Sequence, residues 1–148
     1  MKKHLPFYCS LLFSLFVAVS CKKEQPELQG RWRQDKTLII NYELPFNRKA
    51  SEFNQPLGGV GDVRTLDIGE RNWDWGTTLA QTGATSQIKC TYTRKGDNIR
   101  VEGHTNPTAL PDYKIRSLSD RQLVLVQEVT LTQQNTRTEY ELTFSRAR

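Results

Sequence analysis

Hydrophobic and polar residues alternate along most of the chain after residue 30, in short runs that Gly, Pro, Asn and Asp interrupt. A period of two places apolar side chains on one face of the backbone and polar side chains on the other, as in a half-buried β-strand. The clearest run is 86–94, in which Ile88, Cys90 and Tyr92 alternate with polar residues. No stretch keeps the period of an amphipathic helix over three turns. The pattern therefore predicts an all-β protein.

The alternation predicts eight strands, most of them joined by short turns. They are residues 31–42, 63–68, 73–78, 86–94, 99–103, 112–118, 122–132 and 137–146. Residues 43–62, rich in Gly, Pro and Asn, are predicted to be a long irregular connection. Because short connections favour pairing in order, and because closure removes sheet edges, we predict an eight-stranded antiparallel up-and-down β-barrel. A two-sheet β-sandwich is the alternative, since alternation fits both architectures.

The residues predicted to face inward are bulky, which favours a barrel that side chains fill almost completely. They are Leu38, Tyr42, Leu66, Ile68, Ile88, Tyr92, Ile99, Ile115, Leu125, Leu131, Leu142 and Phe144. Gln127 interrupts this set and needs a partner, which a tyrosine hydroxyl, a water or a ligand could provide. If the interior keeps a cavity for a ligand, the candidate binding residues are Tyr42, Trp73, Trp75, Tyr92 and Gln127. Otherwise the aromatic residues among them are ordinary core residues.

The amino-terminal residues have the features of an export signal. Lys2 and Lys3 precede an apolar run that is shorter than the ~20 residues of a membrane-spanning helix. The sequence AVSC, which ends at Cys21, resembles the lipobox of bacterial lipoproteins, and this implies lipid attachment to Cys21. We therefore expect a lipoprotein signal peptide at residues 1–20, a lipidated tether at 21–29 and a folded domain at 30–148. The alternative is that these residues form a short membrane anchor that is never cleaved from the protein.

Composition and charge exclude some function classes. The chain has 148 residues and a formal charge of +5, of which Lys2 and Lys3 contribute two. The remaining charge is mild and mixed with acids, which does not indicate a nucleic-acid surface. Under the lipoprotein interpretation Cys90 has no partner in the chain, so we expect no disulfide. The residue directly after the cysteine is Lys22, and in this the sequence resembles lipoproteins that are passed on to the outer membrane. We therefore expect this protein to be located in the cell envelope, at the outer membrane.

Three further features resemble the lipocalins. Gly30 and Trp32 form a Gly-x-Trp triplet at the start of the first strand, and a long connection follows that strand like a lid loop. The segments DYKIRSLSDRQLVLVQE and YELTFSRAR are similar to the closing strands of lipocalin-like lipoproteins of the Bacteroidetes. In lipocalins the motif tryptophan closes the narrow end of the barrel under an arginine of the last strand. The resemblance therefore implies a structural plug of Gly30, Trp32 and Arg146, with a cation–π contact between the last two.

Catalytic and metal-binding patterns are weak in this sequence. His104 is the only histidine after the signal, and one histidine without clustered thiols or carboxylates does not make a metal site. Cys90 lies among apolar residues, as a small buried hydrophobe does. We therefore expect no enzyme activity, metal or cofactor. The predicted function is a membrane-anchored lipoprotein that binds a small hydrophobic ligand. The alternative is a filled barrel that acts as a protein-interaction, inhibitor or structural module in the envelope.

Overall fold

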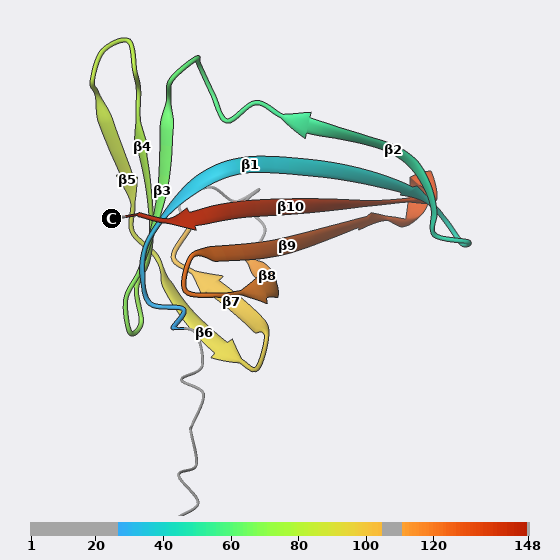
Figure 1. The fold of residues 1–148 in the computed structure, drawn as a ribbon. Coiled ribbons are helices and arrows are strands. Elements are labelled where there is room, and N and C mark those ends of the chain that lie inside the picture. The colour runs from blue at the N-terminus through green and yellow to red at the C-terminus, as the bar shows by residue number, and fades with distance from the viewer. Residues whose placement is uncertain (1–26, 105–110, 148) are drawn as a thin grey trace, which may run out of the picture.

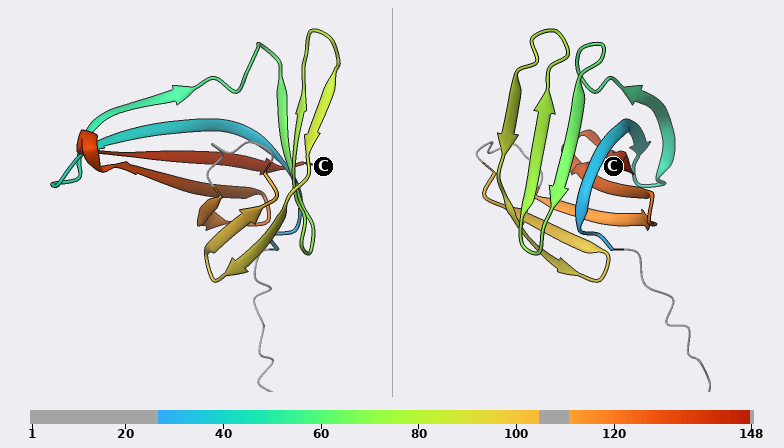
Figure 2. Two further views of the ribbon diagram at one scale, coloured as in Figure 1. Left: turned by 180° about the vertical axis from the view of Figure 1, so that it is seen from behind. Right: turned by 60° about the vertical axis from the view of Figure 1, so that its left-hand side comes forward.

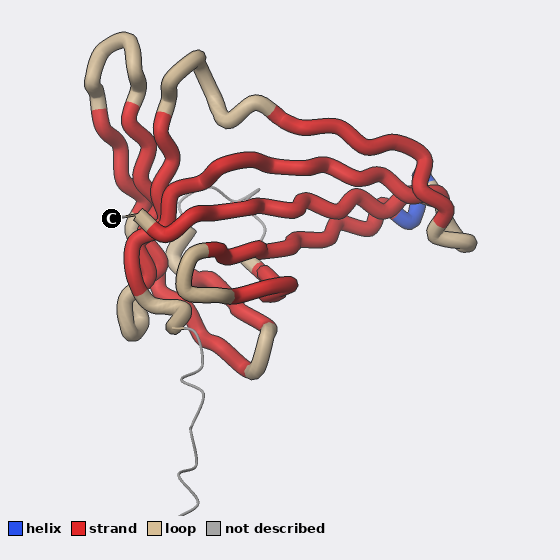
Figure 3. Tube along the Cα trace, in the orientation of Figure 1, coloured by secondary structure: helices blue, strands red, loops and turns tan. Residues whose placement is uncertain are grey.

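The computed structural model describes residues 27–104 and 111–147, which form one antiparallel sheet with a single short helical turn (Figures 1 and 3). The elements are β1 (Gly30–Glu43), β2 (Arg48–Gln55), β3 (Val63–Ile68), β4 (Trp73–Thr78), β5 (Thr85–Ile88), β6 (Thr91–Lys95), β7 (Asn98–Glu102), β8 (Asp112–Leu118), β9 (Gln122–Leu131), the 3-10 turn η1 (Thr132–Gln134) and β10 (Thr136–Arg146). The all-β prediction is confirmed. Cys21 lies outside the described residues, as do the predicted signal peptide and most of the tether.

The sheet has ten strands, so the predicted number of eight is wrong. The first additional strand, β2, lies in the predicted irregular connection, and all eight of its residues are exposed. It therefore carries no alternating apolar pattern by which the sequence could indicate it. The other difference is a break in the predicted strand 86–94. Its two halves, β5 and β6, are separated at Lys89 and Cys90, where the Cys90 carbonyl accepts a hydrogen bond from the Trp73 amide at 3.0 Å.

The strand order is β5-β4-β3-β1-β10-β9-β8-β7-β6, with β2 paired to β1 beside this path. The sheet curls until its two end strands approach each other (Figure 2), but within the described residues it is not closed into a barrel. Lys89 and Cys90 connect the two end strands along the chain, but β5 and β6 do not pair, and the pairing across the opening in the described residues is one isolated bridge between Asn72, next to β4, and Thr91 of β6. Since β5 has only four residues, all of them exposed, it provides little strand for further pairing. The predicted closed eight-stranded barrel is therefore replaced by an open, curled sheet.

The two longest strands, β1 and β10, link two parts of the sheet. Residues 30–33 of β1 pair with β3, and residues 37–43 pair with β2, while β10 follows β1 along nearly its whole length. Residues 37–43 of β1, 136–142 of β10 and 126–131 of β9 extend with β2 away from β3, β4 and β5 (Figure 1). We call this four-stranded extension the arm. It gives the molecule a curled part that holds the core and a projecting part with two accessible faces.

A β-bulge between Gln34 and Lys36 determines which residues of the arm face inward. An extra residue reverses the facing of every side chain beyond it. Thr37 is therefore on the inner face with its partner Leu142, whereas Leu38 and Tyr42 are on the outer face. The prediction that Leu38 and Tyr42 point inward is therefore wrong. It assumed an unbroken period of two, and such a pattern in the sequence does not reveal a bulge.

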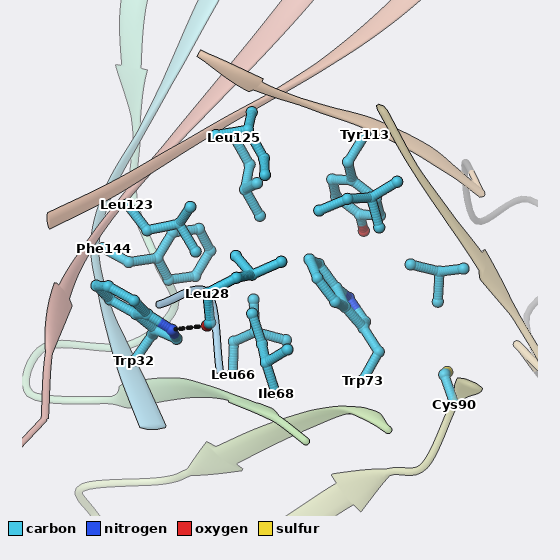
Figure 4. Packing of buried hydrophobic residues seen from close by; sticks show 13 residues of the cluster. Leu28, Trp32, Leu66, Ile68, Trp73, Cys90, Tyr113, Leu123, Leu125 and Phe144 are labelled. Atoms are coloured by element: carbon cyan, nitrogen blue, oxygen red, sulfur yellow. Dashed lines mark hydrogen bonds between the residues drawn. The ribbon is translucent and has the colours of Figure 1, made fainter. Parts of the chain in front are cut away.

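The core lies in the curled part, where aromatic and aliphatic side chains from both ends of the chain pack together (Figure 4). The cluster consists of Leu28, Trp32, Leu66, Ile68, Trp73, Cys90, Ile99, Val101, Tyr113, Ile115, Leu123, Leu125 and Phe144. Trp32, Trp73 and Phe144 are completely buried. Leu28 belongs to the expected tether, yet it is only 4 % exposed and its carbonyl accepts a hydrogen bond from the Trp32 indole at 2.9 Å. The folded part therefore begins before Gly30.

Arg146 covers the buried Trp32 ring from the last strand. Its guanidinium carbon lies 4.2 Å from the ring centroid, which is the cation–π contact that the sequence analysis predicts. The same guanidinium donates to three backbone carbonyls, those of Asp120 (2.9 Å), Gln29 (2.9 Å) and Glu27 (2.5 Å). Gly30 adopts a φ of +131°, and a Cβ there would lie 2.5 Å from Arg146 Nη1. A side chain at residue 30 would thus displace the arginine as well as strain the backbone.

The outer face of the sheet carries a buried carboxylate. Glu139 is 4 % exposed, and its Oε1 lies 2.7 Å from Arg116 Nη2. The other nitrogen of Arg116 donates to Glu141 Oε2 at 2.6 Å. Burial lowers the pKa of Arg116, but the hydrogen bonds to both carboxylates outweigh it, so the pKa lies above its usual value. One arginine therefore holds two carboxylates of the same strand, one of which has little access to water.

Candidate ligand-binding groove

An open groove of about 320 Å³ lies between the inner face of the arm and the wall formed by β3, β4 and β5. Its lining residues come from seven strands, β1–β5, β9 and β10, and from both halves of the chain. They are Gln34, Thr37, Gln55, Arg64, Trp75, Thr77, Ile88, Gln127, Tyr140 and Leu142. The volume is at the lower end of the range for small-molecule sites. In Figure 2 the strands that bound the groove, β1, β10, β3 and β4, meet where the arm joins the curled part.

The apolar wall of the groove comes from Trp75, Ile88 and Leu142. Trp75 is half-buried, and its ring packs against Phe144 with 5.9 Å between ring centroids, so the core supports it from behind. Ile88 is directly opposite Trp75 in the β4–β5 register and is 44 % exposed. On the arm, Phe53 pairs with Ile39 on the same face as Thr37 and is 50 % exposed. The groove thus continues into an accessible apolar surface on the inner face of the arm.

The buried hydroxyl of Tyr113 links the groove to the core. Burial raises the pKa of Tyr113 to about 12, although the hydrogen-bonding side chains of Gln127 and Trp75, which both line the groove, act in the opposite direction. The tyrosine is therefore neutral at physiological pH. This effect of Gln127 on Tyr113 favours a tyrosine hydroxyl as its partner, one of the three possibilities left open by the sequence.

Polar side chains line the side of the groove nearest the β1 bulge. Gln34 is buried and donates through Nε2 to Thr37 Oγ1 at 2.8 Å. Among the lining residues that the structure describes, Arg64 on β3 is the one charged residue and none is a carboxylate. The groove therefore combines an apolar wall, neutral hydrogen-bonding groups and one cation.

The structure brings two of the five candidate binding residues together in this groove, Trp75 and Gln127. Trp73 is completely buried in the core, 5.5 Å from the Tyr92 ring, and the Tyr92 hydroxyl donates to the Gly69 carbonyl. Tyr42 is on the outer face of the arm, where the Arg137 guanidinium lies 4.2 Å from its ring centroid. These last three residues therefore do not line the groove.

Sequence reasoning missed most of the polar lining, including Gln34, Thr37, Gln55 and Arg64. Thr37 and Gln34 lie on either side of the bulge, so no single alternation places both on one face. Gln55 belongs to β2, which has no hydrophobic pattern. Arg64 was detectable in principle, because it is two residues before Leu66 on a predicted strand and therefore shares its face.

Cys90 and His104 form a pair at another place in the curled part. The Cys90 Sγ lies 3.6 Å from His104 Nδ1, and the cysteine is 5 % exposed. Burial first, and the charge of Asp74 second, raise the pKa of the thiol. A raised pKa favours the neutral thiol, whereas a nucleophilic cysteine requires the thiolate. The pair therefore lacks the electrostatic environment that activates cysteine.

Among residues 27–104 and 111–147 no group of three His, Cys, Asp or Glu side chains is placed to hold a metal ion. Within the same residues no helix is long and apolar enough to cross a membrane. Comparisons with protein-family models, curated proteins and solved structures each returned no match.

Proposed function

We propose that this protein is a lipid-anchored binding protein of the cell envelope, which takes a small, largely apolar molecule into the groove beside Trp75. The observation that carries the proposal is a groove of about 320 Å³ in which Trp75 and Ile88 remain accessible although a complete core packs behind them. Apolar walls with a few oriented polar groups are typical of sites for small ligands. Binding requires no catalytic group, so the proposal does not include an enzyme activity.

The anchor is proposed from the sequence. Cys21 ends the lipobox-like AVSC, and attached acyl chains would hold the protein stably on a membrane. The outer membrane is the proposed location because Lys22 follows the cysteine. A lipocalin-like arrangement is proposed as well, supported by the contact of Arg146 with Trp32 and by consecutive strands that curl round one core. The ligand would then enter beside a lipid surface, where apolar molecules are concentrated.

A second candidate function is a protein-interaction module. Phe46, in the turn between β1 and β2 at the end of the arm, is 89 % exposed, and Val60 in the next connection is 99 % exposed. Exposed apolar residues on projecting turns are suited to contact another protein. In this case replacing Phe46 with serine would abolish capture of a specific envelope protein, while variants of the groove would not affect it.

The groove is tested with N-phenyl-1-naphthylamine, a neutral apolar dye that fluoresces on leaving water. Residues 22–148 are used, since the whole described core lies between Leu28 and Phe144, and circular dichroism verifies folding of each variant. We expect saturable binding at one site. Trp75→Ala weakens it by about tenfold, because burial of one aromatic side chain is worth roughly 1.5–3 kcal/mol. Ile88→Ser weakens it by about threefold, since this residue provides a smaller part of the wall.

Val63→Ser is the matched control for this titration. Val63 lies on the same wall, is 39 % exposed and does not line the groove. Its replacement removes a comparable apolar side chain from the surface and leaves the affinity unchanged. Binding that is equally weakened by Val63→Ser, or absent from the unmodified protein, contradicts the proposal.

A further inference from the structure

Arg64 is a cation without a partner inside the groove. It is half-buried on β3, opposite Thr77 in the β3–β4 register. Among the residues that the structure describes, none forms an ion pair or a hydrogen bond with its guanidinium, whereas the guanidinium of Arg31 on the neighbouring strand is paired with Asp67 at 2.7 Å. An arginine has five N–H donors and remains charged at any physiological pH. Its charge in the groove therefore lacks a compensating group from the described part of the chain.

The carboxylates closest in sequence to Arg64 are engaged elsewhere. Asp62 accepts hydrogen bonds from the amides of Gly59 (2.7 Å) and Ala80 (2.9 Å). Asp67 lies on the opposite face of β3 and holds Arg31. The other polar groups of the lining, such as Gln34 and Thr77, are neutral amides and hydroxyls. The electrostatic field of the groove thus has one sign, and it favours an anion.

We propose that Arg64 selects the ligand, and that the groove takes a small amphipathic anion whose apolar part packs on Trp75 and Ile88 while its carboxylate or similar group pairs with Arg64. This inference rests on the proposed function and adds the chemical class of the ligand. The guanidinium and the apolar wall belong to one groove of about 320 Å³, so a single small molecule can contact both. A guanidinium binds a carboxylate through two parallel hydrogen bonds, which gives specificity as well as affinity.

Two dyes with the same ring system separate the apolar contribution from the charged one. N-phenyl-1-naphthylamine is neutral, and 1-anilinonaphthalene-8-sulfonate carries one sulfonate on the same skeleton. Arg64→Gln is expected to weaken sulfonate binding by about tenfold, the value of one charge-assisted hydrogen bond at a partly exposed site. It leaves the affinity for the neutral dye within about twofold. Octanoate and octanol serve as competitors, and octanoate displaces the dyes at lower concentration only while Arg64 is present.

Arg33→Gln is the matched control. Arg33 pairs with Thr65, the residue after Arg64, but points to the outer face and is 61 % exposed. The substitution removes the same charge from nearly the same place on the sheet and leaves the lining of the groove unchanged. We therefore expect both dyes to bind with the same affinity as to the unmodified protein.

The outcomes separate the two proposals. If neither dye binds the unmodified protein, the proposed function fails and this inference fails with it. If the neutral dye binds and the sulfonate does not, or if Arg64→Gln weakens both equally, the groove binds ligands but Arg64 does not select an anion. An equal loss with Arg33→Gln attributes the effect to overall charge and also overturns the inference. Near-ultraviolet circular dichroism verifies native packing in every variant, because loosely packed proteins bind the sulfonate dye nonspecifically.

Discussion

Replacing Trp32 with alanine is expected to lower the free energy of unfolding by about 4 kcal/mol, the typical cost of removing a completely buried aromatic side chain. The substitution also leaves the Leu28 carbonyl without its hydrogen bond and removes the ring that Arg146 covers. Arg146→Met is expected to cost about 3 kcal/mol, because three backbone carbonyls lose a charged donor. Urea denaturation followed by circular dichroism measures both effects.

The double variant shows whether the two residues act together. Since Trp32 and Arg146 are in contact, the loss in the double variant is smaller than the sum of the single losses. Val60→Ala is the control, because Val60 is 99 % exposed and contributes nothing to the core. Strict additivity, or a loss below about 1 kcal/mol for Trp32→Ala, would show that this cluster does not stabilise the fold as described.

Arg116→Met is expected to lower the free energy of unfolding by about 2 kcal/mol at neutral pH. The buried carboxyl group of Glu139 then loses the guanidinium that lies 2.7 Å away. Loss of one partner from a buried ion pair costs roughly 3–5 kcal/mol, but Arg116 is 43 % exposed, so solvent screens part of the interaction. The change is measured by urea denaturation at constant ionic strength.

A second substitution identifies the cause of this loss. Glu139→Gln in the Arg116→Met background removes the unpaired charge, and we expect it to recover about half of the lost stability. Arg100→Met is the control, because the Arg100–Asp112 pair is largely exposed on both sides and contributes little. If Arg100→Met and Arg116→Met have equal effects, or if Glu139→Gln restores nothing, burial of Glu139 is not the reason for the loss.

The strands that bury one face could be predicted from the sequence, and those that bury none could not. In β7 and β8 the apolar residues of the alternating pattern are buried in the structure, as predicted. They are Ile99 and Val101 in β7, and Tyr113 and Ile115 in β8. In β2 all residues are exposed, so pairing with β1 depends on backbone hydrogen bonds that leave no mark on composition. The number and closure of the strands were therefore mispredicted.

The candidate site depended on features that a periodic pattern does not contain. The bulge after Gln34 moved Tyr42 to the outer face and Thr37 to the inner face. Trp73 and Trp75 point to the same side of β4, yet Trp73 packs in the centre of the core and Trp75 lies at its edge, where it lines the groove. How deeply a side chain is buried in a curled sheet depends on the three-dimensional shape of the sheet. The sequence could therefore indicate which aromatic residues were candidates, but not which of them lie in the core and which in the groove. The contact between Trp32 and Arg146 was predictable because a family resemblance supplied both residues.

The most direct test of the central claim, that the groove beside Trp75 is the binding site, is a ¹H–¹⁵N correlation spectrum recorded during titration with N-phenyl-1-naphthylamine. The chain has three tryptophans, and only Trp75 lines the groove, whereas Trp32 and Trp73 are completely buried. We predict that the indole N–H signal of Trp75 moves as the dye saturates, together with the side-chain amide signals of Gln34 and Gln127. The indole signals of Trp32 and Trp73 remain in place. Shifts at Trp32 or Trp73 without a shift at Trp75, or no shift at any of the three, would contradict the account.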